Sequence, residues 1–481
     1  MTGIKDSNII QQTSTENKLT LKDKFGYGSA ATGDAVAYMF LNTFLLFFLT
    51  TVAGIQPVVA GTITIIGTIW NALMNPIIGY ISDNARTKWG RRRPYMVVFC
   101  LPLLLGMTLL FTSFQMPYSF KVAYYCVMII VFWTGYTGFF VPYYALGAEY
   151  TNDYSDRTSI RAFASFFNVI GTVFSMVMPT YIVEILERSF GFSDRVSWAL
   201  TSLLLAVISV ISILITVGES KHVDVCCEEE IKEESHAKAG GLALGRMFRE
   251  YFDVMKLKPM KWLLLSSCFY LVAFTIAMTD LVYLMTYNCG FSGTGVSLGM
   301  LCRSAGIGLC IPVYTKLCKI LDKRSVHLAV IGLVSVGLLL IRMVNSGSIL
   351  ELVLVIGFLA IMSQSYWQTM PATFYDLCEY DEYYTGKRRE GAILSVQGLV
   401  EAIASGIGSQ LLGVILQISG FDGAVSEQSE LALEWVFNCS TVVPVVFLVL
   451  SAITFMKFPI TKKYYNNIIN ELERRKNGLS Q

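Results

Sequence analysis

The chain has 481 residues, of which 54% are hydrophobic and 15% are charged, with a mean hydropathy of +0.55 and a formal net charge of +2. Soluble domains spend about a quarter of their residues on charged side chains. A chain this apolar has more hydrophobic surface than a globular core can bury, so lipid must cover the rest. The composition therefore excludes a soluble globular protein, and it gives no sign of a nucleic-acid partner.

Twelve apolar runs follow one another along the chain, and each is long enough to cross a bilayer as a helix. Several contain Gly or Pro, which membrane helices tolerate better than soluble ones do. The sequence thus predicts an all-α membrane protein with helices at 33–53, 57–81, 95–115, 121–147, 161–184, 196–217, 262–288, 295–319, 326–344, 349–374, 391–418 and 434–457.

The basic residues between these runs predict the orientation. Of the 37 Lys and Arg residues, 32 lie on the side that holds both termini. Because cytoplasmic loops are enriched in Lys and Arg, we expect both termini in the cytoplasm and the chain in the inner membrane. A polar stretch separates two blocks of six helices. The expected divisions are a cytoplasmic segment at 1–32, a first bundle at 33–217, a cytoplasmic linker at 218–261, a second bundle at 262–457 and a cytoplasmic tail at 458–481.

The sequence offers little that would support enzyme chemistry. It has three histidines, His222, His236 and His327, and its eleven cysteines show no paired spacing for metal or redox work. We therefore expect no enzyme, no cofactor and no metal site. A sensor would need a signalling domain beside the helices, and the sequence predicts none.

A cluster of charges follows the second helix. Asp83 ends that helix, and Arg91, Arg92 and Arg93 follow within a compact Gly-Arg-Arg-Arg-Pro segment. A carboxylate accepts hydrogen bonds from the amides of a helix start, and arginines reach carboxylates and helix ends. We interpret the cluster as a latch between the cytoplasmic ends of helices that opens during transport. The alternative is that these arginines only fix the topology.

At this point the chain resembles the glycoside–pentoside–hexuronide:cation symporter family, to which melibiose permease belongs. The resemblance covers nearly the whole chain, and it rests on the charged segment just described and on further motifs. These are Tyr27-Gly28 with Gly33-Asp34, Gly135 to Tyr144, Ala148-Glu149 to Arg161, and Asp376 to Gly391. The resemblance implies the major facilitator fold, with two six-helix halves around a central site, and import of a glycoside, pentoside or uronide together with a cation.

The chain departs from this family at the cation site. The two helix 2 aspartates of the melibiose branch fall on Asn71 and Asn75. Their spacing places both amides on one face of the helix. An amide carries no charge and does not titrate, so the pair cannot hold a proton, and it lacks the carboxylate that offsets the dehydration of sodium. We expect a disabled site; the alternative is that the two amides simply bond neighbouring helices.

The sugar site implied by the resemblance is also altered. The helix 1 aspartate falls on Ala35 beside Asp34, the helix 4 aspartate falls on Phe140, and the helix 11 lysine falls on or next to Ala402, close to Glu401. The helix 4 tryptophan falls on Tyr144. The substrate-binding residues that we expect are Asp34, Tyr144, Arg161, Trp367, Gln368, Gln397 and Arg303.

Charged side chains inside membrane helices are costly and are functional candidates by default. Asp280 and Glu401 are candidates for coupling, and Arg303 is a permanent positive charge within an apolar run. Arg303 has two interpretations. It either forms a structural bridge to Asp280 or Glu401, or it grips an anionic group of the substrate, for which its fork suits a carboxylate.

Together these features predict a monomeric secondary transporter that imports a glycoside, pentoside or hexuronide-like solute by alternating access. We expect no dependence on sodium, and a proton is favoured over sodium as a co-transported cation. Two alternatives stay open. One is a carrier of the same fold for a lysolipid, a nucleoside or an organic acid, and the other is a uniporter or exchanger without cation coupling.

Overall fold

The computed structural model describes residues 19–85, 87, 89–150, 154–222, 249–344, 348–386, 389–425 and 427–476. Over these residues the chain is helical and has no strands, and twelve of its helical segments are long and apolar enough to cross a membrane. The twelve helices that the sequence predicts are therefore confirmed. Most of the expected linker, 223–248, lies outside the described residues.

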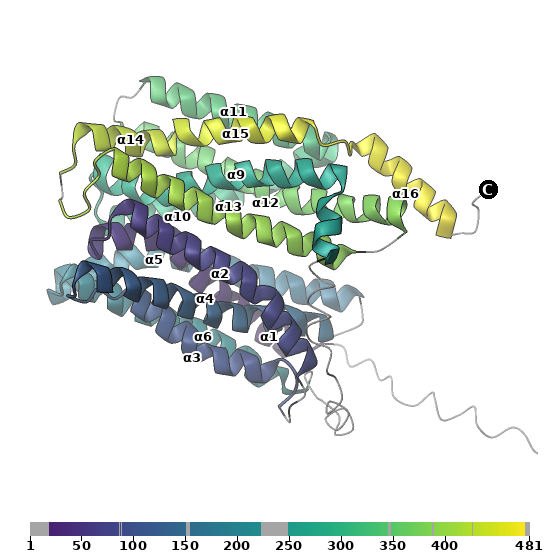
Figure 1. Cartoon of the computed structure of the whole chain (residues 1–481), viewed down its shortest axis with the longest axis horizontal. Coiled ribbons are helices and arrows are strands. Elements are labelled where there is room, and N and C mark those ends of the chain that lie inside the picture. The colour runs from purple at the N-terminus through teal and green to yellow at the C-terminus, as the bar shows by residue number, and fades with distance from the viewer. Residues whose placement is uncertain are drawn as a thin grey trace, which may run out of the picture.

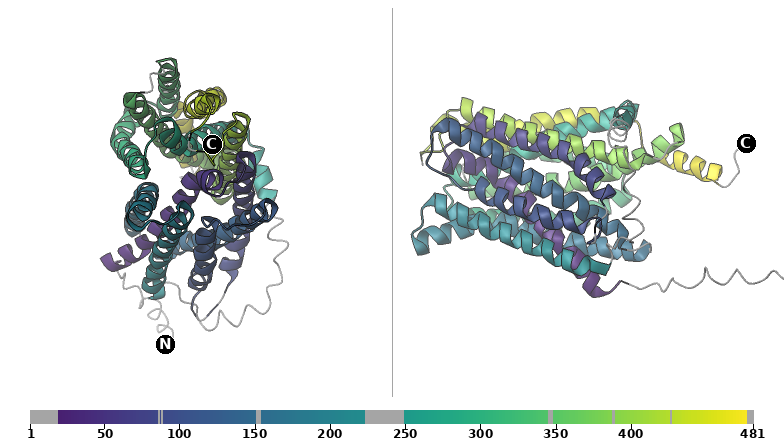
Figure 2. Two further views of the ribbon diagram at one scale, coloured as in Figure 1. Left: turned by 90° about the vertical axis from the view of Figure 1, so that its left-hand side faces the viewer. Right: turned by 60° about the horizontal axis from the view of Figure 1, so that its bottom comes forward.

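The helices form two bundles that lie side by side, with the first half of the chain in one bundle and the second half in the other (Figures 1 and 2). The first bundle contains α1 (Leu21–Phe47), α2 (Pro57–Asn84), α3 (Arg93–Leu110), α4 (Tyr118–Glu149), α5 (Tyr154–Phe190) and α6 (Asp194–Glu219). The second contains α9 (Lys258–Tyr283), α10 (Gly293–Ile320), α11 (Lys323–Val344), α12 (Ile349–Thr385), α13 (Glu390–Ile418), α14 (Glu430–Ser440) and α15 (Val442–Met456), followed by α16 (Lys462–Lys476).

Several helices are longer than their apolar runs. The first begins at Leu21 rather than near residue 33, and Thr20 and Asp23 form a capping box at its start. A capping box satisfies two amide groups that the helix leaves free. Similarly, α12 continues to Thr385 and ends at Gly386, which has a left-handed backbone conformation with φ 66°. Hydropathy finds only the part of a helix that lipid surrounds, so polar extensions escape it.

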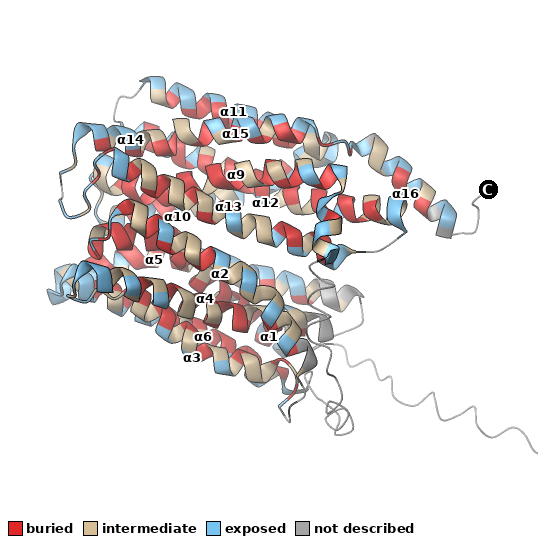
Figure 3. Cartoon of the chain, in the orientation of Figure 1, coloured by how far each residue is buried: buried red, intermediate tan, exposed pale blue. Residues whose placement is uncertain are grey.

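The helices of both bundles carry buried and exposed residues (Figure 3), and many of the exposed residues are large and apolar. Val98, Leu309 and Met343 are examples of such exposed residues. Small residues instead occupy the contacts between helices. A Cβ atom on Gly135 of α4 would lie 2.3 Å from the backbone nitrogen of Leu103 in α3. This pattern is that of a membrane protein, in which lipid covers the apolar surface and small residues let helices approach closely.

The two bundles touch at the end of the molecule that lies away from both chain termini. Near this end α1 and α9 each finish in a short π-helix, Phe48–Val52 and Leu284–Asn288. Thr50 Oγ1 of the first π-helix lies 2.7 Å from Tyr283 Oη at the end of α9. Beside them, α2 packs on α13 and α5 packs on α10. These contacts close the molecule at this end, which we call the closed end.

The contacts at the closed end are polar and tight. Thr180 Oγ1 of α5 and Ser297 Oγ of α10 lie 2.7 Å apart, and the carboxylate of Glu184 accepts a hydrogen bond from the amide of Thr294. At the same end, between α2 and α13, the amide of Val58 donates to Gln417 Oε1 at 3.0 Å. Both halves therefore contribute to the closure through specific hydrogen bonds.

Candidate functional site

A central cavity of about 960 Å³ lies between the two bundles. At its rim on the side of the termini, Phe252 is 63% exposed, whereas the closed end seals the opposite side. The cavity is large enough for a sugar or another small ligand. Its lining includes Asp34, Ala35 and Tyr38 of α1, Asn71, Asn75 and Tyr80 of α2, Tyr136, Phe140 and Tyr144 of α4, Asn168 of α5, Trp367 of α12, and Glu401 and Ala402 of α13.

Asp34 is an almost buried carboxylate on the wall of this cavity. Tyr136 donates a hydrogen bond of 2.6 Å to its Oδ1 atom. No ion pair joins Asp34 to a basic side chain in the part of the chain that the structure describes. Because a carboxylate accepts several hydrogen bonds, Asp34 keeps acceptor capacity for a ligand. Tyr136 fixes the orientation of the Asp34 carboxylate.

Glu401 places a second carboxylate on the cavity, from the opposite half of the molecule. Its Oε1 atom accepts hydrogen bonds from Gln397 Nε2 at 2.8 Å and from the hydroxyl of Tyr366 at 3.2 Å. Tyr366 is held in turn by Ser267, 2.5 Å away. Within the described ranges, Glu401 also lacks a basic partner. Gln397 therefore lies behind Glu401 and positions it, rather than lining the cavity itself.

Aromatic rings also line the central cavity. Trp367 is 46% exposed and Tyr144 is 42% exposed, and both line the cavity. The guanidinium of Arg161 lies 5.1 Å from the centre of the Tyr144 ring, on the side of the termini. Arg161 itself is not a lining residue, and neither is Gln368, which donates to Thr315 Oγ1 at 3.3 Å. Exposed ring faces of this kind suit the apolar face of a sugar ring.

Asn71 and Asn75 both line the cavity, as the helix spacing predicts. The Oδ1 atom of Asn71 accepts a hydrogen bond of 2.8 Å from Thr137 of α4, and Asn75 Nδ2 lies 3.5 Å from the same oxygen. One of the two amide oxygens therefore already has protein donors, which favours the interpretation that these amides bond their neighbours.

Arg303 does not lie on the central cavity, where it would have to lie to bind an anionic group of the substrate. It is 3% exposed and lies in the contact between α10 and α5, where its Nη1 atom is 3.2 Å from the sulfur of Met176. Its Nε atom has no hydrogen-bond partner within the described ranges, and Arg303 does not line the cavity. The bridge to Asp280 or Glu401 is also missing from the described ion pairs. Charge in a helix does not reveal which face packs on a neighbour, and this face of α10 packs on α5.

Asp280 is fully buried between α9 and α14 and lies outside the cavity lining. Ser440 donates to its Oδ2 atom at 2.5 Å, while Oδ1 has no hydrogen-bond partner in the described part of the chain. Of the two expected coupling residues, only Glu401 is therefore in contact with the space that a solute would occupy.

The expected latch is only partly visible, because the side chain of Asp83 lies outside the described residues. Arg92 donates to Ser82 Oγ at 3.1 Å, and Arg93 donates to the carbonyl oxygen of Val217 at 3.1 Å, which ties α3 to α2 and α6. Arg91 has a partner as well. The arginines thus join helix ends within the first bundle.

Sequence reasoning missed the corresponding pairs of the second bundle. Arg389 at the start of α13 makes two hydrogen bonds, of 2.8 and 2.5 Å, to the buried carboxylate of Asp381 in α12. These bonds raise the pKa of the Arg389 guanidinium above its ordinary value. Lys323 of α11 pairs with Asp376 at 2.5 Å. The signal was present, since both acids and Arg389 belong to the motif from Asp376 to Gly391.

Comparison with known proteins identifies the family. The family model described as MFS/sugar transport protein matches residues 25–462. The uncharacterized symporter YnaJ of Bacillus subtilis is 26% identical and covers 95% of this chain and 96% of its own length. The isoprimeverose transporter of Lactiplantibacillus pentosus is 24% identical, and the match covers 93% of this chain and 90% of that protein. The sodium-dependent lysophosphatidylcholine symporter 1-A of Danio rerio is 23% identical, and the match covers 96% of this chain and 91% of that protein.

Among solved structures, a bacterial homolog of the human lysosomal transporter Spinster, in an inward-facing and unoccupied conformation, is similar with a TM-score of 0.65 at 14% identity, covering 93% of this chain and 97% of that one. This likeness confirms the major facilitator fold. The relatives are membrane transporters rather than enzymes, and their names as symporters imply a small-molecule substrate and a co-transported ion. The chain therefore belongs to the MFS/sugar transport family of glycoside–pentoside–hexuronide carriers, and it is a multi-pass membrane transporter.

Proposed function

We propose that this transporter imports a glycoside, pentoside or hexuronide-like solute, which binds in the central cavity. The observation that carries the proposal is the pair of carboxylates, Asp34 and Glu401, that reach one cavity from opposite halves beside the ring of Trp367. Carboxylates accept the hydrogen bonds that sugar hydroxyls donate, and an aromatic ring covers the apolar face of a sugar. The isoprimeverose transporter among the relatives supports this substrate class.

The same arrangement supports a mechanism of alternating access. With both termini placed in the cytoplasm by the distribution of Lys and Arg, the cavity faces inward and the closed end faces outward. A solute that bridges Asp34 and Glu401 would draw the two halves together around itself. Such a contact favours the occluded state over either open state, because only then do both carboxylates reach the solute.

We further propose that transport does not depend on sodium at the helix 2 position. Asn71 and Asn75 carry no charge, and Asn71 Oδ1 already accepts from Thr137. Glu401 is the candidate for coupling, because it lines the cavity and can exchange a proton with the water there. A proton is therefore the co-transported cation that this site favours.

A lysolipid is the second candidate substrate. Apolar residues at the rim of the cavity, Leu73, Phe252 and Met255, are exposed and could cover an acyl chain. The lysophosphatidylcholine symporter among the relatives supports this alternative.

Uptake into proteoliposomes tests these proposals. The panel contains labelled xylose, isoprimeverose, a methyl glucoside, a methyl glucuronide and lysophosphatidylcholine, each with no ion gradient, a sodium gradient or a proton gradient. The proposal predicts saturable uptake of a sugar that a proton gradient increases and a sodium gradient does not. Saturable uptake of the lysolipid alone would contradict the sugar assignment. Equal uptake with and without either gradient would indicate a uniporter or exchanger.

A further inference from the structure

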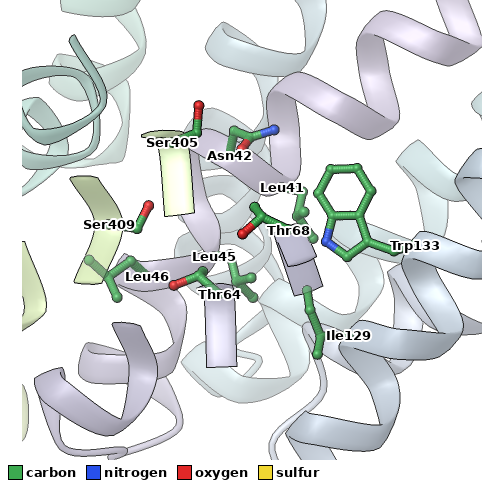
Figure 4. A pocket seen from close by; sticks show the side chains of 10 residues that line it. All are labelled: Leu41, Asn42, Leu45, Leu46, Thr64, Thr68, Ile129, Trp133, Ser405 and Ser409. Atoms are coloured by element: carbon green, nitrogen blue, oxygen red, sulfur yellow. The ribbon is translucent and has the colours of Figure 1, made fainter. Parts of the chain in front are cut away.

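A second, much smaller cavity lies beyond the central one, toward the closed end. It is enclosed by α1, α2, α4 and α13, and its volume of about 10 Å³ is close to that of one water-sized sphere. Polar side chains from both halves surround it in the middle of otherwise apolar helices (Figure 4). They are Asn42, Thr64, Thr68, Trp133, Ser405 and Ser409.

This small cavity continues the lining of the central cavity. On α2, Thr64 and Thr68 precede Asn71 and Asn75 at spacings of four, three and four residues, which is one face of a helix. On α13, Ser405 and Ser409 follow Glu401 at steps of four. Two polar stripes, one from each half, therefore run from the central cavity to the closed end.

Three of the four hydroxyl groups that line this cavity already donate hydrogen bonds to backbone carbonyls, and their oxygens can still accept. Thr64 donates to the carbonyl of Gly61 at 2.7 Å, Thr68 to that of Ile65 at 3.0 Å, and Ser405 to that of Glu401 at 2.9 Å. The amide nitrogen of Asn42 likewise donates to the carbonyl of Tyr38 at 2.8 Å. Each oxygen keeps lone pairs, so a ligand between these side chains can donate hydrogen bonds to them.

Trp133 also lines the small cavity, and its indole nitrogen calls for a ligand that accepts a hydrogen bond. Its side chain is 2% exposed, and its Nε1 donor has no hydrogen-bond partner among the residues that the structure describes. The nitrogen is on the edge of the ring that faces Leu41 and Thr68 (Figure 4). A buried donor without a partner costs free energy, and an acceptor would relieve that cost. An ammonium or alkali ion cannot accept this bond, and a carboxylate cannot donate to the oxygens. A hydroxyl group does both, whether it belongs to a water molecule, whose size matches the cavity in this state, or to a sugar that enters when the cavity widens.

We propose that this small cavity is an outer subsite for the hydroxyl groups of an uncharged sugar. It widens when α2 and α13 separate at the closed end, and it then receives the solute before the solute reaches Asp34 and Glu401. This inference rests on the proposed function and adds to it that the leading end of the substrate is neutral and hydroxylated.

The test compares the two sides of the membrane. The probe is the sugar that the wild-type carrier takes up fastest from the panel above. The variant Thr64→Val/Thr68→Val keeps the side-chain shape and removes both acceptors. The control is Thr62→Val, because Thr62 lies on an exposed face of the same helix and also donates to a backbone carbonyl.

For the double variant we expect the KM of entry from the closed end to rise about tenfold, while the KM of entry from the side of the termini changes less than threefold. Trp133→Phe should raise the first KM as well, and Thr62→Val should change neither. In a second readout, Ser409→Cys should react with an impermeant thiol reagent added at the closed end, beyond the wild-type background, and the sugar should slow that reaction.

Three outcomes would overturn the subsite. If sugar uptake persists and the double variant has an unchanged KM on both sides, the hydroxyls do not bind the solute. If both KM values rise equally, the residues act on the fold. If the wild type carries no sugar at all, the proposed function fails first, and the subsite falls with it.

Discussion

The tight contact between α2 and α13 at the closed end lets us predict the effect of adding one methyl group there. Gly413 of α13 packs on α2 so tightly that a Cβ atom there would lie 2.3 Å from the carbonyl oxygen of Pro57. Cβ atoms in proteins essentially never approach another heavy atom closer than 3.0 Å, and the obstacle here is backbone rather than a mobile side chain. Gly413→Ala must therefore move α2 away from α13 and strain the hydrogen bond between Val58 and Gln417, which is 3.0 Å long.

Overpacking of this kind costs roughly 1–3 kcal/mol. The cost applies to the state in which the two helices touch and not to the state in which they are apart. The equilibrium should therefore shift about 5- to 150-fold toward opening at the closed end, following the relation between free energy and population. Because the open state exposes Ser409, the labelling rate of Ser409→Cys from that side should rise at least fivefold in the Gly413→Ala background.

The control is Gly332→Ala in α11, because no atom lies within 4 Å of the position where its Cβ would be. Gly332→Ala should leave the labelling rate unchanged. An equal labelling rate in Gly413→Ala and Gly332→Ala, with both proteins folded, would refute the reasoning that the α2–α13 contact is what closes this end.

Three further predictions concern substitutions that add or remove a charge. Asn71→Asp/Asn75→Asp should introduce sodium-stimulated uptake into a carrier that otherwise ignores sodium, and sodium stimulation of the wild type would contradict the expectation. Arg303→Met should leave sugar affinity unchanged and raise the thermal unfolding temperature, because it removes a buried guanidinium whose desolvation cost no described ion pair offsets; a loss of affinity would restore Arg303 to the binding site. Asp381→Asn should weaken the pair with Arg389 and change the turnover rate by severalfold at nearly constant equilibrium affinity, whereas loss of binding in a folded variant would exclude a latch.

The sequence predicted the fold well because its strongest pattern, the series of long apolar runs, follows directly from the requirements of a lipid bilayer. Lipid requires long apolar helices, and their number and order follow directly from the hydropathy of the chain. Of the substrate-binding residues that the sequence predicts, Asp34, Tyr144 and Trp367 line the central cavity. The others, Arg161, Gln368, Gln397 and Arg303, do not line it. These expectations needed only the helix on which each residue lies and the resemblance to the family.

What the sequence could not predict is the facing of individual side chains and the contacts across the molecule. Arg303 is buried against Met176 because α10 packs on α5, and a charge in an apolar run does not show that contact. The partners of Asp34 and Glu401, Tyr136 and Tyr366, lie 102 and 35 residues away along the chain. Such distant pairs come together only through tertiary packing, which one sequence without its relatives does not reveal.

The most direct test of the central claim is the equilibrium binding of the transported sugar to purified Asp34→Asn and Glu401→Gln. Each substitution keeps the size of the side chain and removes the charge-assisted acceptor, which contributes roughly 1.5–3 kcal/mol. Asp280→Asn is the matched control, because Asp280 is a buried carboxyl that does not line the cavity. The account predicts that the Kd rises at least tenfold in both cavity variants and less than threefold in the control. Unchanged affinity in both cavity variants would contradict the claim that these two carboxylates hold the solute between the halves.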